Sequence, residues 1–369
     1  MSPLHPNIDG VIYFYIFICV SLLVFNLGYI FRSKGRSRAQ QHRCEVWSTC
    51  LEKTLDTLRI LGDVPPEHRA LLSRKLRSIQ ELMAYHEALE PRLGEPLVQE
   101  YLDRCHDDFQ ALAAVYCRRP PMERAFFAYL IALYHPDRGR KHDQLAELLL
   151  AFLDDSTVYC RENVLRALCA LGNAGGVEHA LSRFHDQGWY HHARLLSDGL
   201  MTFAGDQEAL ARRLWTAAAG WNESLQVAVV QFVTNLPADF SDLCLPALRA
   251  ADTLPETRFA LIRYFQRHPN DLARPALLDL ASGGEAVGGG PAIAACAALA
   301  KYPGDDTKAV LETALHSRNW YIRRNAASSL VTLGVTERDL QDVERSGDRY
   351  AREMLVYMTR LRFGEGVGV

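Results

Sequence analysis

The first 31 residues contain no Lys or Arg, and Asp9 is their only charged residue. Residues 11–31 form an uncharged run in which only Ser21 and Asn26 are markedly polar. A helix of that length spans about 30 Å, the thickness of the hydrocarbon core of a bilayer. A cleaved signal peptide would need a basic start, a shorter apolar run and a small-residue cleavage site, and all three are missing. The sequence therefore predicts a single transmembrane helix at 11–31, after a short extracytoplasmic N-terminus at 1–10.

A basic segment at 32–43 follows the apolar run. Because positive charge flanks the cytoplasmic end of a span, the protein is predicted to be single-pass in the cytoplasmic (inner) membrane. The N-terminus would lie outside and the remaining chain in the cytoplasm. Each basic side chain would be attracted to anionic headgroups by about 1 kcal/mol. The predicted membrane-surface residues are Arg32, Lys34, Arg36, Arg38 and Arg43.

The rest of the chain has no excess of positive charge. Residues 44–369 carry 36 basic and 43 acidic side chains, a net charge of −7, which makes general nucleic-acid binding a poor expectation. The nine cysteines are scattered and include no C-x-x-C pair, which fits a reducing cytosol. The apolar fraction of 49% excludes extensive disorder.

Signatures of catalysis and of metal or phosphate binding are also missing. The chain has no H-E-x-x-H, no G-x-S-x-G and no G-x-x-x-x-G-K-[ST]. The histidines near residues 179–192 lack a carboxylate at ligand spacing, and the Gly-rich stretch 282–291 is expected to be a loop between helices. We therefore expect no enzyme activity, catalytic residue, cofactor, metal or small-molecule substrate.

Strand-like alternation is missing too, and the apolar spacing is helical almost throughout, so the fold is predicted to be all-α. An N-terminal helical region at 44–120 is expected to contain three helices, near 40–61, 65–89 and 96–117. The first carries Trp47, Leu51, Leu55 and Leu58 on one stripe.

A repeat begins at about residue 121. Turn residues that could cap a following helix recur at 173, 206, 239, 271, 305 and 336, in steps of 31 to 34 residues. A unit of about 33 residues cannot bury its apolar face alone, so such units must stack on their neighbours.

A second pattern runs through the same region. Tyr159-Cys160-Arg161 through Leu171-Gly172 aligns with Tyr321-Ile322-Arg323 through Leu333-Gly334, and Tyr350-Ala351-Arg352 repeats its start. In this respect residues 121–363 resemble the HEAT-repeat family, including the short variant related to phycobilisome lyases. The resemblance implies an α-solenoid of about seven two-helix repeats, followed by a flexible tail at 364–369.

The same resemblance implies roles for particular segments. The second helices would line the concave side, near 157–171, 189–203, 222–235, 256–267, 291–301, 319–333 and 349–361. The recurrent arginines would be structural and tie adjacent repeats together; they are Arg161, Arg258, Arg323 and Arg352. Positions one and five residues after this arginine are expected to face the inner groove, which gives Glu162, Arg166, His192, Phe259, Arg263 and Arg324.

Together these features favour a membrane-tethered scaffold or adaptor that binds a membrane-associated protein on its concave surface. An accessory subunit of a membrane glycosyltransferase or of an envelope-assembly complex would have this organisation. Two alternatives stay open. One is a HEAT-like enzyme of the lyase or DNA glycosylase type, and the other is a lipid-surface module that uses the basic segment.

Overall fold

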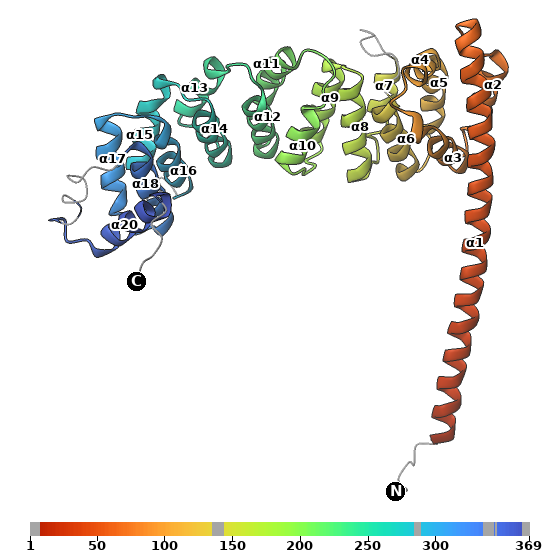
Figure 1. Cartoon of the computed structure of the whole chain (residues 1–369), viewed down its shortest axis with the longest axis horizontal. Coiled ribbons are helices and arrows are strands. Elements are labelled where there is room, and N and C mark those ends of the chain that lie inside the picture. Colours follow the sequence, from red (N-terminus) through yellow and green to blue (C-terminus); the bar gives the residue numbers. More distant parts are fainter. Residues whose placement is uncertain (1–7, 135–143, 284–288, 335–342, 344, 364–369) are drawn as a thin grey trace. The chain divides into compact units, whose positions relative to one another are not determined.

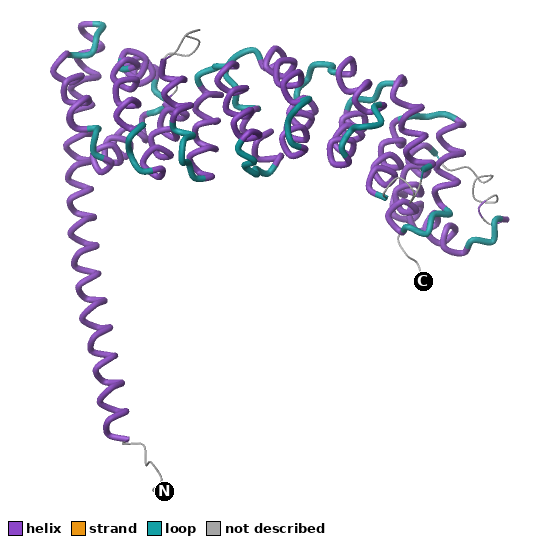
Figure 2. The backbone as a smooth tube through the Cα atoms, turned by 180° about the vertical axis from the view of Figure 1, so that it is seen from behind, coloured by secondary structure: helices purple, strands orange, loops and turns teal. Residues whose placement is uncertain are grey.

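The computed structural model describes residues 8–134, 144–283, 289–334, 343 and 345–363; for 8–12, 27–33, 36 and 363 it describes the backbone alone. Throughout these residues the regular secondary structure is helical, without a strand, which confirms the all-α prediction (Figure 2). The chain divides into two compact units, residues 1–167 and 168–369.

Unit 1 contains more helices than the sequence pattern predicted. Its helices are α1 (Ile8–Leu61), α2 (Pro66–Lys75), α3 (Ile79–Leu89), η1 (Glu90–Arg92), α4 (Pro96–Arg104), α5 (His106–Tyr116), α6 (Pro121–Tyr134), α7 (Gln144–Ala151) and most of α8 (Val158–Ala170). The helices expected near 65–89 and 96–117 are each broken into two. The breaks lie next to Leu76 and at Cys105, which are fully buried, so the apolar spacing continues across each break.

The last third of α1 belongs to the core of unit 1. It packs against α3 and α4, and the predicted stripe of Trp47, Leu51, Leu55 and Leu58 is buried to 2% exposure or less. The Trp47 indole N–H donates to a carboxylate oxygen of Glu81 on α3 at 3.0 Å. The stripe prediction is therefore confirmed.

The first two-thirds of α1 continue without a break through the segments that were predicted to be separate. Figure 1 shows this part of α1 extending away from the other helices of unit 1. The described apolar side chains here are strongly exposed, for example Tyr13 at 72% and Phe25 at 71%. The predicted span 11–31 lies only in part among the residues whose side chains are described. Of the described residues, none forms a helix long and apolar enough to cross a membrane.

Unit 2 follows the predicted helix positions closely. It contains α9 (Ala174–Asp186), α10 (Ala193–Leu200), α11 (Gln207–Ala218), α12 (Glu223–Asn235), α13 (Ser241–Arg249), α14 (Pro255–Arg267), η2 (Asp271–Ala273), α15 (Arg274–Ser282), α16 (Gly290–Ala298), η4 (Leu299–Lys301), α17 (Asp305–Leu315), α18 (Trp320–Leu333) and α20 (Arg349–Phe363). The predicted second helices correspond to α8, α10, α12, α14, α16, α18 and α20.

Alternate helices of unit 2 pack in sequence order. Helix α10 contacts α12, and the same row continues through α14, α16, α18 and α20 (Figure 1). In a second row, α9 contacts α11 and α15 contacts α17. Each helix of the first row from α10 to α18 therefore packs against the helix about one repeat later.

Side-chain hydrogen bonds join groups about one repeat apart. Ser329 donates to the Cys296 carbonyl at 2.7 Å, and Asn325 donates to the Ile293 carbonyl at 3.0 Å. The Tyr302 hydroxyl donates to the Phe265 carbonyl at 2.8 Å. Residues of unit 2 that are joined by these bonds are therefore separated in sequence by about the length of one repeat.

The predicted caps are correct in part. Asn173 and Asp206 accept hydrogen bonds from backbone N–H groups three residues later. The cap expected at Asp271 is instead Asn270, because its side chain reaches the Leu272 N–H at 3.0 Å. At the next turn Gly304, not Asp305, precedes the helix, and position 336 lies outside the described residues.

The tie made by Tyr302 gives a test of this stacking. Tyr302 is 1% exposed, and Tyr302→Phe leaves the Phe265 carbonyl without its donor. The substitution should lower the free energy of unfolding of unit 2 by about 1–3 kcal/mol, as measured by urea denaturation. Tyr357→Phe, at a hydroxyl-bearing side chain that is 56% exposed, is the matched control. Equal effects of the two substitutions would contradict the assigned tie.

Candidate functional site

The recurrent arginines identify equivalent positions in successive repeats. Arg258 donates to the carbonyls of Ala250 and Ala251 at 2.7 and 3.2 Å, and Arg323 donates to the Ser317 carbonyl at 3.3 Å. Arg161 likewise donates to the Ser156 carbonyl. Each guanidinium thus binds the turn that precedes its own helix, whereas the resemblance implied a tie between adjacent repeats.

Two of these arginines differ in their further surroundings. The Arg323 guanidinium also lies 5.4 Å from the ring of Tyr350, which belongs to the next repeat. Arg352, at the corresponding place on α20, is exposed. Of the four arginines that were predicted to be structural, Arg161, Arg258 and Arg323 bind turn carbonyls.

The arginine position can be followed through repeats that lack arginine. Counting back from Arg258 in steps of 32 and 33 residues reaches Gln226 on α12 and Ala193 on α10. The residues one and five positions later are Arg194 and Asp198 on α10, Val227 and Gln231 on α12, and Phe259 and Arg263 on α14.

These six side chains all line one hollow of about 440 Å³ on the row α10, α12 and α14. The remaining lining residues are Ser197, Thr234, Asn235, Glu256 and Ala260. Three successive second helices thus contribute the same two positions to one surface. We take this hollow as the candidate functional site.

The side chains in the hollow are arranged for contact rather than for catalysis. The Arg263 guanidinium lies over the Phe259 ring at 4.2 Å from its centroid. The Arg194 and Asp198 side chains form an ion pair at 3.8 Å, and both are largely exposed, so the pair adds little stability. The Asn235 amide oxygen accepts a hydrogen bond from Arg267 at 2.9 Å.

The chemistry of the hollow suits a polypeptide segment. It offers an aromatic ring under a guanidinium, charges of both signs, and the amide of Gln231. Aromatic and arginine side chains often dominate the binding energy of protein interfaces. Amides can both donate to and accept from a peptide backbone.

The structure brings together only two of the six predicted groove residues, Phe259 and Arg263. Glu162 and Arg166 lie on α8, and Arg324 lies on α18 with its guanidinium 5.7 Å from the Trp320 ring. His192 does not line the hollow. It is the N-cap of α10, where Nδ1 accepts from the Arg194 N–H at 3.3 Å, because α10 begins at Ala193 rather than near 189.

The basic residues after the apolar run have different surroundings. Lys34 and Arg38 are exposed on α1, whereas the side chains of Arg32 and Arg36 lie outside the described residues. Arg43 forms an ion pair with Glu81 on α3 at 3.6 Å. Arg43 is therefore part of the surface of unit 1.

A cysteine and a histidine in unit 1 have the spacing of a nucleophile and its base. Cys50 Sγ lies 3.5 Å from His68 Nδ1, but the same nitrogen contacts the Thr54 hydroxyl at 3.0 Å, and Nε2 contacts the Tyr101 hydroxyl at 2.8 Å. Burial lowers the pKa of His68 to about 4 and raises the pKa of Cys50. A neutral thiol beside a histidine whose ring nitrogens are both engaged does not favour nucleophilic catalysis.

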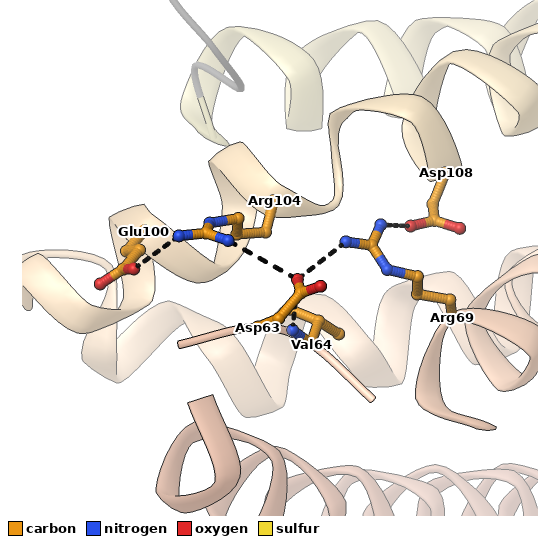
Figure 3. Close-up of polar contacts among 6 residues, drawn as sticks. All are labelled: Asp63, Val64, Arg69, Glu100, Arg104 and Asp108. Atoms are coloured by element: carbon orange, nitrogen blue, oxygen red, sulfur yellow. Dashed lines mark hydrogen bonds and ion pairs between the residues drawn. The ribbon is translucent and has the colours of Figure 1, made fainter. Parts of the chain in front are cut away.

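A chain of ion pairs within unit 1 is also structural (Figure 3). Asp63 lies between Arg69 and Arg104, at 3.4 and 3.8 Å. The two arginines bind Asp108 and Glu100, so the chain connects the turn after α1 with α2, α4 and α5. Burial raises the pKa of Asp108, although Arg69 acts in the opposite direction. Every charged group drawn has a partner of opposite sign, as in a structural network.

Metal ligands do not gather in the described part of the chain: it contains no group of three or more His, Cys, Asp or Glu side chains placed to hold an ion. His185, from the predicted histidine cluster, accepts from the Asn222 N–H at 3.1 Å, and His191 stacks on Phe184.

Comparison with protein-family models gave no match, and no curated protein matched the sequence.

The buried His68 predicts a specific dependence of stability on pH. Its pKa of about 4 is below the ordinary 6.5, so between these values only the unfolded chain takes up the proton. The free energy of unfolding of unit 1 should fall by about 3 kcal/mol as pH drops from 7 to 4 because of this group. Urea titrations followed by the ¹⁹F signal of 5-fluorotryptophan at Trp47, whose ring lies 6.5 Å from His68, would measure it.

In these titrations His68→Gln should flatten the dependence, and His179→Gln, at an exposed histidine, should not. Unchanged pH dependence in the His68 variant would show that other groups cause it.

Proposed function

We propose that this protein is a membrane-tethered scaffold or adaptor that binds a segment of a partner protein in the hollow of α10, α12 and α14. The observation that carries the proposal is the convergence of equivalent positions from three successive helices on one surface. In this proposal the protein has no catalytic activity of its own, because the hollow presents contact groups rather than a nucleophile and a base.

We further propose that residues 121–363 form a HEAT-like α-solenoid of about seven repeats. Support comes from the ordered row of second helices and from hydrogen bonds between groups about one repeat apart. A solenoid suits a scaffold, since stacked units create an extended binding surface without a closed cavity.

The membrane tether is proposed for residues 11–31. The described apolar side chains between Tyr13 and Phe25 are exposed except for the half-buried Ile18, and the run carries no charge. Large contiguous exposed apolar surfaces are rare in proteins that face only water. The positive residues after the run favour a cytoplasmic location for the rest of the chain.

The continuity of α1 adds a geometric feature to the tether. From residue 31 to Trp47 the helix rises by about 24 Å, at 1.5 Å per residue. The core of unit 1 would therefore be held off the membrane by a helical rod instead of a flexible segment. This spacing suits a partner that is itself membrane-associated, such as a subunit of a glycosyltransferase or envelope-assembly complex, because tethering raises the local concentration of such partners.

The binding surface can be tested by site-specific crosslinking in native membranes. A photoreactive amino acid at Gln231 should capture a partner protein, and Arg263→Glu should reduce that capture at least tenfold by reversing a charge in the hollow. Arg360→Glu reverses an exposed charge on α20 and should leave capture unchanged. Capture that survives Arg263→Glu would contradict the assignment of the hollow.

The tether can be tested by placing charge within the apolar run. An arginine near the middle of a span costs about 3 kcal/mol, so Val20→Arg combined with Leu22→Arg should release the protein from membranes washed with alkaline carbonate. Ile60→Arg with Leu61→Arg alters two exposed apolar residues at the far end of α1 and serves as the control. Retention of the first variant at the wild-type level would disprove the tether.

A further inference from the structure

A second hollow of unit 2 lies between two adjacent helix pairs, α11–α12 and α13–α14. It has a volume of about 230 Å³ and includes Gln226, the residue that stands in the arginine position of its repeat. Its other lining residues are Trp215, Ala218, Ala219, Val229, Val230, Ala247, Asp252, Thr253, Leu254 and Thr257. Helices α12 and α14 contribute to both this hollow and the proposed docking surface, but no residue lines both.

Gln226 partly replaces the missing arginine. Its side-chain amide donates to the Trp221 carbonyl at 3.0 Å, in the turn before its own helix, as the arginines do in other repeats. Its amide oxygen accepts from the Thr257 hydroxyl of the next repeat at 3.2 Å. Glutamine is shorter than arginine and carries no charge, so the repeat keeps a turn contact but lacks the guanidinium.

Two lining residues of the hollow correspond in sequence to the turn residues that a guanidinium binds in the next repeat. Arg258 binds the carbonyls of Ala250 and Ala251, which lie eight and seven residues before it. The residues at the same separations from Gln226 are Ala218 and Ala219, and both line the hollow. The wall also includes the indole of Trp215, and guanidinium groups stack favourably on aromatic faces.

Charge at the hollow favours a cation. Asp252 lines it and is exposed, and within the described part of the chain no ion pair is found for its carboxylate. Arg258, on the neighbouring helix α14, is engaged with turn carbonyls instead. A carboxylate beside an indole and turn carbonyls is the chemistry that recognises a guanidinium.

We propose that this hollow binds an arginine side chain of a partner protein, in the place left by the missing arginine of the repeat. The arginine would extend its guanidinium toward the turn at Ala218 and Ala219 and stack against Trp215, with Asp252 as its counter-charge. The site does not depend on the docking surface or on the membrane tether proposed above.

The test uses the full chain in detergent micelles, labelled with 5-fluorotryptophan. The probe is N-acetyl-arginine amide, and its neutral isostere N-acetyl-citrulline amide is the ligand control. We expect a saturable ¹⁹F shift at Trp215, assigned with Trp215→Phe, for the arginine compound alone. Asp252→Asn should weaken binding at least fivefold, whereas Asp279→Asn, at an exposed carboxylate on α15, should not change it.

A second variant fills the site from within. Gln226→Arg should abolish the shift at Trp215 and raise the melting temperature by about 2–4 °C, because the chain then supplies its own guanidinium. Absence of a saturable shift, an equal shift with the citrulline compound, or unchanged binding in the Asp252→Asn protein would overturn the proposal. The citrulline and Asp252 arms keep the test decisive even if Gln226→Arg fails to fold.

Discussion

The structure of unit 2 depends on one constraint: a pair of short helices cannot bury its apolar side without a neighbouring pair. The mean repeat is about 33 residues, too few for an independent core. Stacking satisfies this constraint and also fixes which side chains can meet. Groups one repeat apart come into contact, as Ser329 does with the Cys296 carbonyl and Tyr302 with the Phe265 carbonyl. The same regularity places equivalent positions of successive helices beside one another.

Residues that are not needed for stacking can vary from repeat to repeat, and such residues can form a binding surface. In the row α10, α12 and α14, the positions one and five residues after the arginine position carry different chemistry in each helix, yet all line one hollow. The arginine position itself varies as well. Where arginine is present it binds a turn, and where Gln226 replaces it a second hollow lies beside the turn. The two hollows of unit 2 therefore lie where the sequence varies between repeats, at the groove positions and at Gln226.

Much of this architecture could be predicted from the sequence. The buried stripe from Trp47 to Leu58 and the second helices of unit 2 follow from apolar spacing and turn residues. The breaks next to Leu76 and at Cys105 could not be predicted, because both residues are buried and preserve the helical pattern. The continuity of α1 was missed for the opposite reason, because its basic segment at 32–43 has no apolar pattern. Gly35 has the lowest helix propensity in this segment, and the helix continues through it.

The candidate site shows a similar division. The rule for groove positions leads to Phe259 and Arg263, which line the hollow and follow an arginine that marks the register. It led to His192, which does not line the hollow, because Ala193 carries no sign of being the equivalent position. It was not applied at Gln226, although doing so would have identified Val227 and Gln231. The arginine position also keeps no constant distance from the helix start: α10 begins at Ala193 itself, whereas α12 and α14 begin three residues before Gln226 and Arg258.

Hydroxyl-radical footprinting in native membranes tests most directly whether the hollow is a docking surface. If a partner segment occupies it, Phe259 should be oxidised several-fold more slowly in membranes than in the purified protein, while Trp320 on α18 should react equally in both. Equal oxidation of Phe259 in the two preparations would contradict the account.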